Sequence, residues 1–325
     1  MATLDQKAML AALNVSQWTA RKEDKKITKE VETAHNAKDA GKYHKVLIAK
    51  ESIQTIQKIV NEARIYHYTV TLPWNDNGER ILPTALFFDY SRAIAKFKGQ
   101  FETAVNSFLD NYPALIDAAR TRLNGMFNQE DYPTIKKVKG KFSFSHQFTP
   151  IPSTSDFRVD LQQEEIEKIK SALDARLKAR EQEAVKDLWE RLFSTVSHAA
   201  ERLSDPDAIF RDSLIVNIQE LVNLLPKLNF TDDPTLEKLR REVENKLLRF
   251  DPATLREDKA ARKQIAQEAR ELLKTIGPHV KEEQPQEEQP EPAAALEAAT
   301  TAPSPAPPAP PAETDSKIEA MSTLF

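Results

Sequence analysis

The chain has 325 residues, of which 40% are hydrophobic and 30% are charged, so it can form one or two domains with much solvated surface. It contains six glycines and no cysteine, which excludes disulfides, thiolate zinc sites and a cysteine nucleophile, and argues against a glycine-rich nucleotide-binding domain. Because no apolar run is long enough to cross a bilayer, we expect a cytoplasmic protein.

The net charge of −4 is unevenly distributed along the chain. Residues 281–325 hold nine acidic and two basic residues, which leaves +3 for residues 1–280. The fold class we predict is mainly α, with an elongated antiparallel helical arm and a small antiparallel β element (1–155), a helical bundle (156–280) and a disordered tail (281–325). The tail is predicted to be disordered because it is acidic, rich in proline and poor in large apolar residues.

The first distinctive segment is basic. Residues 20–30 follow Trp18 and hold five basic and three acidic side chains. Basic clusters of this kind indicate contact with phosphates. The candidate nucleic-acid-binding residues here are Arg21, Lys22, Lys25 and Lys26.

Two apolar stripes with heptad-like spacing predict helices over residues 46–63 and 87–108 that pack antiparallel, as in a coiled coil. The turn residues at 75–78, between apolar runs, predict a β-hairpin that joins the helices. Trp74, beside the turn, is a candidate partner contact; the alternative is a purely structural hairpin. Pro113 is predicted to kink or end the second helix.

The stretch KFSFSHQFTPIP alternates apolar and polar residues and predicts a strand over 141–149 that pairs with the hairpin around residues 66–82. Lysines beside the strand aromatics Phe142 and Phe144 are typical of a surface that stacks single-stranded bases and binds their phosphates. The alternative is a solvated rim with the phenylalanines in the core. The candidate lysines are Lys136, Lys137, Lys139 and Lys141.

The second section is predicted to be entirely helical. A capping box of Asp160 and Gln163 precedes a long helix. Three Asp-Pro pairs, in which the aspartate caps and the proline occupies the first turn, predict three further helix starts. These pairs are at residues 205–206, 233–234 and 251–252, and Gly277-Pro278 is predicted to end the last helix.

No motif in the sequence indicates catalysis. There is no P-loop, dinucleotide fingerprint, His-Glu-x-x-His, Gly-x-Ser-x-Gly or EF-hand loop. The six histidines lack ligand spacing and are better explained as surface or structural residues. The sequence therefore predicts no enzymatic activity, no metal and no cofactor.

The C-terminal tip combines a capping box, Ser316 to Glu319, with an apolar cluster. An acidic linker that ends in an apolar tip resembles the partner-recruiting tails of bacterial and phage single-stranded-DNA-binding proteins, although their Asp-rich end is missing. The tip is therefore predicted to bind a partner as a helix in a groove, against the alternative of a frayed terminus. The candidate residues are Ile318, Met321, Leu324 and Phe325.

Several phrases across residues 10–275 are similar to an uncharacterised helical family of phages, integrative elements and proteobacteria. They are LNVSQWTARKED, FLDNYPALIDAA, KFSFSHQFTPIP and FRDSLIVNIQELVNLLPKLNFTDDPTLEKL. Genes of that family tend to lie near MoxR- or cobalt-chelatase-like AAA ATPases and recombination genes. The resemblance implies a role in DNA metabolism or an ATPase partner, and it provides no catalytic residues.

Three functions remain open at this stage. The first is a non-enzymatic phage or mobile-element accessory protein, expected to be a homo-oligomer, that acts through protein–protein contacts in DNA metabolism, with an AAA ATPase or recombination protein as a candidate partner. The second is a single-stranded nucleic-acid-binding protein with a partner-recruiting acidic tail. The third is a virion structural or scaffolding protein.

Overall fold

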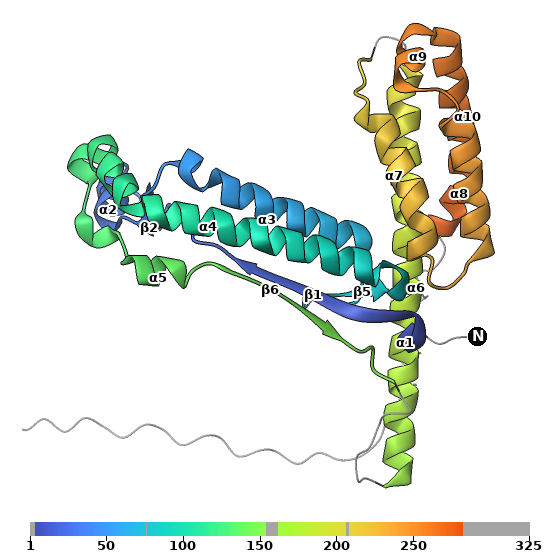
Figure 1. The fold of residues 1–325 in the computed structure, drawn as a ribbon, viewed down its shortest axis with the longest axis horizontal. Coiled ribbons are helices and arrows are strands. Elements are labelled where there is room, and N and C mark those ends of the chain that lie inside the picture. The colour runs from blue at the N-terminus through green and yellow to red at the C-terminus, as the bar shows by residue number, and fades with distance from the viewer. Residues whose placement is uncertain (1–3, 76, 154–161, 206–207, 282–325) are drawn as a thin grey trace, which may run out of the picture. The chain divides into compact units, whose positions relative to one another are not determined.

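The computed structural model describes residues 4–75, 77–153, 162–205 and 208–281. Contacts divide the chain into Met1–Glu282 and Glu283–Phe325, and the division of the first unit at residue 155 stays a prediction. In chain order the helices and strands are α1 (Leu4–Lys7), β1 (Ala8–Ser16), β2 (Arg21–Glu23), α2 (Lys25–Ala34), β3 (His44–Val46), α3 (Lys50–Val70), β4 (Leu72–Pro73), β5 (Glu79–Pro83), α4 (Phe87–Leu123), α5 (Ile135–Lys139), β6 (Ser143–Thr149), α6 (Gln163–Ser204), α7 (Ser213–Leu228), α8 (Pro234–Leu247), α9 (Pro252–Glu257) and α10 (Lys259–Lys281). The first unit is thus mainly α with a small antiparallel sheet, which confirms the predicted fold class for the described residues (Figure 1).

The main sheet has the strand order β4-β5-β1-β6, and all its pairs are antiparallel. Strand β1 pairs with β5 from Ala8↔Pro83 onward and with β6 from Leu10↔Thr149 onward. The prediction that residues 141–149 pair directly with the hairpin is therefore wrong, because β1 lies between them.

The predicted hairpin is present but short. Helix α3 continues to Val70, so the first strand, β4, has only two residues. In the turn, the Asn75 side chain accepts a hydrogen bond from the Asn77 amide at 3.0 Å, and Gly78 has φ +87°. A left-handed backbone at Gly78 costs little because glycine has no Cβ. The hairpin therefore joins α3 to α4 as predicted.

Helices α3 and α4 pack against each other through the predicted stripes (Figure 1). The buried stripe residues are Ile53, Ile56, Val60, Ala63, Tyr90, Ile94, Phe101 and Phe108. The predicted range 46–63 starts too early, because Val46 lies in β3 and is 38% exposed. Phe97, within the predicted range 87–108, is only half-buried. Pro113 does not end α4, which continues to Leu123.

Capping and proline signals in the sequence predicted only some of the later helix ends correctly. The carboxylates of Asp233 and Asp251 accept hydrogen bonds from backbone amides at the starts of α8 and α9, as predicted. Asp205, in contrast, is the C-cap of α6, and α7 starts only at Ser213. Helix α10 continues through Pro278 to Lys281, so the predicted stop is also wrong. The N-cap of α6 is Gln162, and the predicted capping residue Asp160 lies outside the described residues.

Among the described residues, no helix combines the length and apolar character needed to span a membrane.

Candidate functional site

Lysines from two distant parts of the chain meet at one end of the first unit. Lys22 of β2 donates from Nζ to Asp131 Oδ1 at 2.8 Å, and Asp131 lies just before α5. Arg122 donates to the carbonyl oxygen of Val46 at 2.7 Å, which ties the end of α4 to β3. Residues 21–46 and 117–141 therefore form one surface, which we call the basic end (Figure 1).

A buried lysine holds the basic end together. Lys45 of β3 is 6% exposed, and its Nζ lies 2.8 Å from Asp131 Oδ2 and 3.0 Å from Asp24 Oδ2. Burial lowers the pKa of Lys45, but the hydrogen bonds to Asp131 and Asp24 outweigh it and raise the pKa above its usual value. Burial likewise raises the pKa of Asp131, yet the hydrogen bonds from Lys22 and Lys45 hold it below its usual value. Both Lys45 and Asp131 are therefore charged at neutral pH.

The predicted nucleic-acid-binding residues all lie exposed on this end: Arg21, Lys22, Lys25, Lys26, Lys136, Lys137, Lys139 and Lys141. Within the described part of the chain, Lys22 pairs with Asp131, and the Nζ of Lys26 lies 4.0 Å from Glu30. The basic end as a whole has fourteen basic and eight acidic residues, a net charge of +6. The remainder of residues 1–280 then carries −3, so positive charge is concentrated here.

The aromatics predicted to stack on bases pack against the core of the unit. Phe144 is 7% exposed and its ring centroid lies 5.6 Å from that of Phe101. Phe142 is half-buried, with its ring 5.8 Å from that of Phe108. Phe144 therefore belongs to the core, as the alternative expected, and Phe142 packs against that core while it stays partly exposed. Tyr43, which the sequence reasoning missed, is 42% exposed between α2 and β3 and is an aromatic surface residue of the basic end.

Of the predicted partner-binding residues, the structure describes only Trp74. Trp74 is 6% exposed and belongs to the core, so its side chain is not presented at the surface of the hairpin. The four residues of the tip, Ile318, Met321, Leu324 and Phe325, lie outside the described residues. Recruitment of a partner by the tip stays a prediction.

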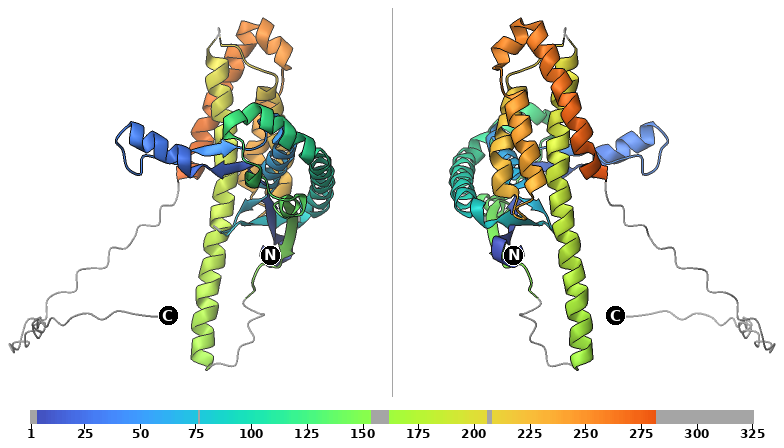
Figure 2. Two further views of the ribbon diagram at one scale, coloured as in Figure 1. Left: turned by 90° about the vertical axis from the view of Figure 1, so that its left-hand side faces the viewer. Right: turned by 90° about the vertical axis from the view of Figure 1, so that its right-hand side faces the viewer.

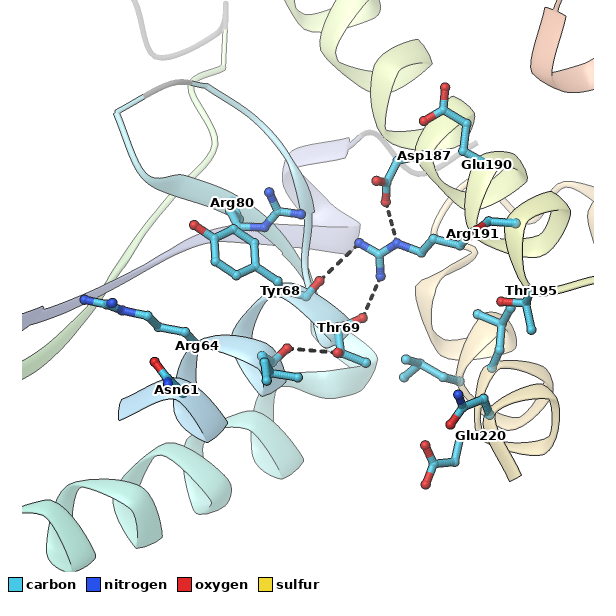
Figure 3. Close-up of a pocket in the computed structure, with 15 residues that line it drawn as sticks. Asn61, Arg64, Tyr68, Thr69, Arg80, Asp187, Glu190, Arg191, Thr195 and Glu220 are labelled. Carbon is cyan, nitrogen blue, oxygen red and sulfur yellow. Dashed lines mark hydrogen bonds and ion pairs between the residues drawn. The ribbon is translucent and has the colours of Figure 1, made fainter. Parts of the chain in front are cut away.

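A large cleft lies elsewhere, where α3, β5, α6 and α7 meet (Figure 3). It has a volume of about 940 Å³. Two of its lining residues, Ile65 and Tyr68 of α3, are 66% and 56% exposed. Half-buried Leu221 and Leu224 of α7 line the cleft from another helix. The cleft thus combines exposed apolar side chains with charged ones.

Two arginines in this cleft cap the C-terminus of α3. Arg191 of α6 donates to the carbonyl oxygens of Tyr68 and Thr69 at 3.1 and 2.6 Å (Figure 3). It also donates to the carbonyl oxygen of Thr71 at 2.7 Å. Arg80 of β5 donates to the Thr71 hydroxyl at 2.8 Å. The last carbonyls of a helix lack partners within it and carry partial negative charge, so cations are favourable there. These arginines fasten α3 to the sheet and to α6.

One carboxylate completes this arrangement. Asp187 Oδ2 lies 2.7 Å from Arg191 Nε, one helical turn away on α6. Burial raises the pKa of Asp187 despite the nearby Arg191 and Arg80, and burial also lowers the pKa of Arg80. A carboxylate with a perturbed pKa in a cleft is a general indicator of a functional site, but here the ion pair also has a structural role in orienting Arg191. No sequence signal pointed to the cleft, because Arg191 and Thr71 are 120 positions apart.

His67 is a structural histidine within the arm. It is 4% exposed, and its Nδ1 lies 2.8 Å from the Tyr90 hydroxyl. Burial, assisted by the positive charge of Arg80, lowers the pKa of His67 to about 4. It is therefore neutral at pH 7.

Among the described residues, no group of three or more His, Cys, Asp and Glu side chains is arranged to hold a metal ion. No protein-family model matches the chain, and comparisons with curated proteins and with solved structures gave no significant match.

Proposed function

We propose that the protein is a non-enzymatic accessory factor that binds nucleic acid through the phosphate backbone, using its basic end. The observation that carries this proposal is the meeting of two basic segments at Asp131, which pairs with both Lys22 and Lys45. Segments about 100 positions apart thereby present one positive surface. The family resemblance also implies a role in DNA metabolism.

The chemistry of the surface defines the mode of binding. Exposed lysines neutralise phosphates and release counterions, which gives affinity without reading the sequence of the bases. Because Phe142 and Phe144 are turned into the core, the basis for preferring single strands is weakened. We therefore expect single-stranded and duplex DNA to bind with similar affinity, both depending strongly on salt.

Fluorescence anisotropy with a labelled single strand and the matching duplex tests this proposal. Replacing Lys136, Lys137, Lys139 and Lys141 by glutamate should abolish binding, since four phosphate contacts change sign. Replacing only some of them by glutamine should flatten the plot of log affinity against log salt, by about 0.7 to 0.9 per contact removed.

A matched control uses four exposed cations of the C-terminal helices, Lys238, Lys263, Arg270 and Lys274. Their replacement by glutamate changes the net charge by the same amount but leaves the basic end intact. The proposal predicts clear binding by this control variant. Equal loss of affinity in both variants, or no binding by the wild type at low salt, would contradict it.

A second candidate function is protein–protein contact at the α3–α6–α7 cleft. The observation in its favour is the exposure of Ile65 and Tyr68 beside Leu221 and Leu224. Exposed apolar side chains in a cleft are typical of sites that bind a protein segment. An AAA ATPase or recombination protein, as the family resemblance implies, is the partner class to test first, with purified candidates and with the Ile65→Ser/Tyr68→Ser variant. Capture that survives this variant but is lost in Leu324→Ala/Phe325→Ala would assign recruitment to the tip instead.

A further inference from the structure

Helix α6 is covered by α10 along only part of its length. The Arg262 guanidinium of α10 donates to the Arg202 carbonyl of α6 at 3.0 Å, and His279 stacks on Trp189 with ring centroids 4.2 Å apart. The two helices are therefore antiparallel. Since α10 ends at Lys281, two residues after His279, it does not accompany the first part of α6 (Figure 2).

The apolar stripe of α6 nevertheless continues into this uncovered part. The buried residues of α6 begin at Ala184, whereas residues 163–180 include none that is buried. Within those residues Ile166, Ile169, Leu173 and Leu177 are spaced 3, 4 and 4 apart, which places them on one side of the helix. Ile169 is 38% exposed. Leu177 is partly buried against the core of the unit, whereas Ile166, Ile169 and Leu173 lie outside that core among the described residues. A regular stripe that leaves its core in this way indicates a second helix as its partner.

The charges beside the stripe define the direction of that partner. The beginning of the segment is acidic, with Glu164, Glu165 and Glu167, and its end is basic, with Arg176, Lys178 and Arg180. Two copies aligned in parallel would place like charges together. Two antiparallel copies place the acidic beginning of each beside the basic end of the other.

We propose that a second copy of this chain packs antiparallel on residues 163–180 of α6. With a twofold axis between Ser171 and Ala172, Ile166 faces Leu177 of the second copy, and Ile169 faces Leu173. The same register places Glu165 beside Arg176 on one flank and Lys170 beside Asp174 on the other. One register thus satisfies the apolar and the charged positions, as a twofold interface requires.

The interface is small, so the dimer is weak. Eighteen residues of helix span about 27 Å, at roughly 1.5 Å per residue. Contacts of this size belong to the weak end of protein interfaces, and we expect a dimer that dissociates on dilution through the micromolar range. Glu165 also pairs with Lys168 of its own helix, at 3.1 Å, but both side chains are solvated and free to exchange partners.

Charge-reversal variants of the full chain test the pairing by analytical ultracentrifugation. The basic variant Glu165→Arg/Asp174→Lys and the acidic variant Lys170→Glu/Arg176→Glu should each be monomeric, because each repels itself on both flanks. An equimolar mixture of the two should dimerise, and the chain with all four substitutions should dimerise alone. A wild type that is monomeric at every concentration, or a mixture that stays monomeric, would overturn the proposal.

Single cysteines test the orientation, since the chain has no cysteine of its own. In the antiparallel dimer the two copies of Ala172→Cys lie near the twofold axis and should be joined by a short bismaleimide. The two copies of Gln163→Cys are about 25 Å apart along the axis, at roughly 1.5 Å per residue, and should not be joined. In a parallel pair every residue lies at the height of its own copy, so cross-linking of Gln163→Cys would show a parallel arrangement and refute the register. Failure of Ala172→Cys to cross-link would also refute it, because the twofold axis would then lie elsewhere. DNA binding by the basic end is independent of either outcome.

Discussion

Replacement of Asp131 by asparagine removes the carboxylate that joins the two halves of the basic end. Its oxygens lie 2.8 Å from both Lys22 Nζ and Lys45 Nζ, and the side chain is 7% exposed. Breaking a fully buried ion pair costs about 3–5 kcal/mol, but Lys45 keeps Asp24 at 3.0 Å, and an asparagine oxygen still accepts one hydrogen bond. The half-exposed Lys22 adds little. We therefore expect a loss of about 2–4 kcal/mol in the free energy of unfolding.

The same substitution distinguishes net charge from geometry in nucleic-acid binding. By charge alone, removal of a carboxylate should strengthen binding to DNA. If Asp131 holds β2 beside α5, its removal separates the two lysine segments and binding should weaken. The neighbouring Glu130 is exposed, and Glu130→Gln changes the charge equally without touching these ion pairs. We expect Glu130→Gln to bind slightly tighter than the wild type and Asp131→Asn to bind more weakly.

Stability and DNA affinity are measured on the wild type, Asp131→Asn and Glu130→Gln. Urea denaturation gives the free energy of unfolding, and anisotropy with a labelled oligonucleotide gives the affinity at a temperature where all three are folded. A loss of stability below about 1 kcal/mol for Asp131→Asn, together with tighter binding than the wild type, would refute the reasoning, since it would mean that the ion pairs do not organise the basic end.

Three further predictions concern the arm and its junction with α6. The pKa of His67 is about 4 in the folded state and 6.5 for an unperturbed histidine, so the unfolded chain binds more protons between these two pH values. The free energy of unfolding should therefore fall by about 3 kcal/mol as the pH drops from 6.5 to 4. Denaturation of His67→Gln at several pH values should show a flatter dependence on pH than the wild type. Phe101→Ala should cost about 3–5 kcal/mol because Phe101 is 3% exposed, whereas Phe97→Ala should cost less because Phe97 is half-buried; equal costs in chemical denaturation would contradict the packing of α4. Arg191→Ala should lower the free energy of unfolding by about 2–3 kcal/mol, because three carbonyl oxygens lose their donor. Arg191→Lys should recover under half of this loss, since an ammonium group cannot reproduce the planar guanidinium that spans the three carbonyls. Full recovery by lysine in the same assay would argue against capping by Arg191.

Features with local signals can be predicted from the order of the residues alone. The stripes of α3 and α4 are visible because a buried helix face repeats every three or four residues, whatever it packs against. The starts of α8 and α9 are visible because Asp233 and Asp251 bind amides only two and three residues ahead. The hairpin turn is visible for the same reason, because the Asn75 side chain accepts a hydrogen bond from the amide of Asn77, two residues ahead.

Features that depend on partners far away in the chain follow from the folded arrangement. Residues 8–13, AMLAAL, favour a helix by intrinsic propensity, yet they form β1 because β5 and β6 supply hydrogen bonds on both sides. Asp205-Pro206 has the same local signature as the two confirmed helix starts. Asp205 nevertheless follows the end of α6, where Arg262 of α10 donates to its carbonyl oxygen.

The residues of the candidate site can be read from the sequence, but their arrangement cannot. The sequence shows which residues are basic, but their meeting at one end depends on Lys22 and Lys45 reaching Asp131 across 109 and 86 positions. The cleft likewise lies between segments distant in the chain, with Arg191 of α6 donating to carbonyl oxygens at the end of α3. The sequence shows the chemistry of each side chain. A binding surface, however, is formed by segments that are distant in the chain, and only the packing of the whole unit brings those segments together.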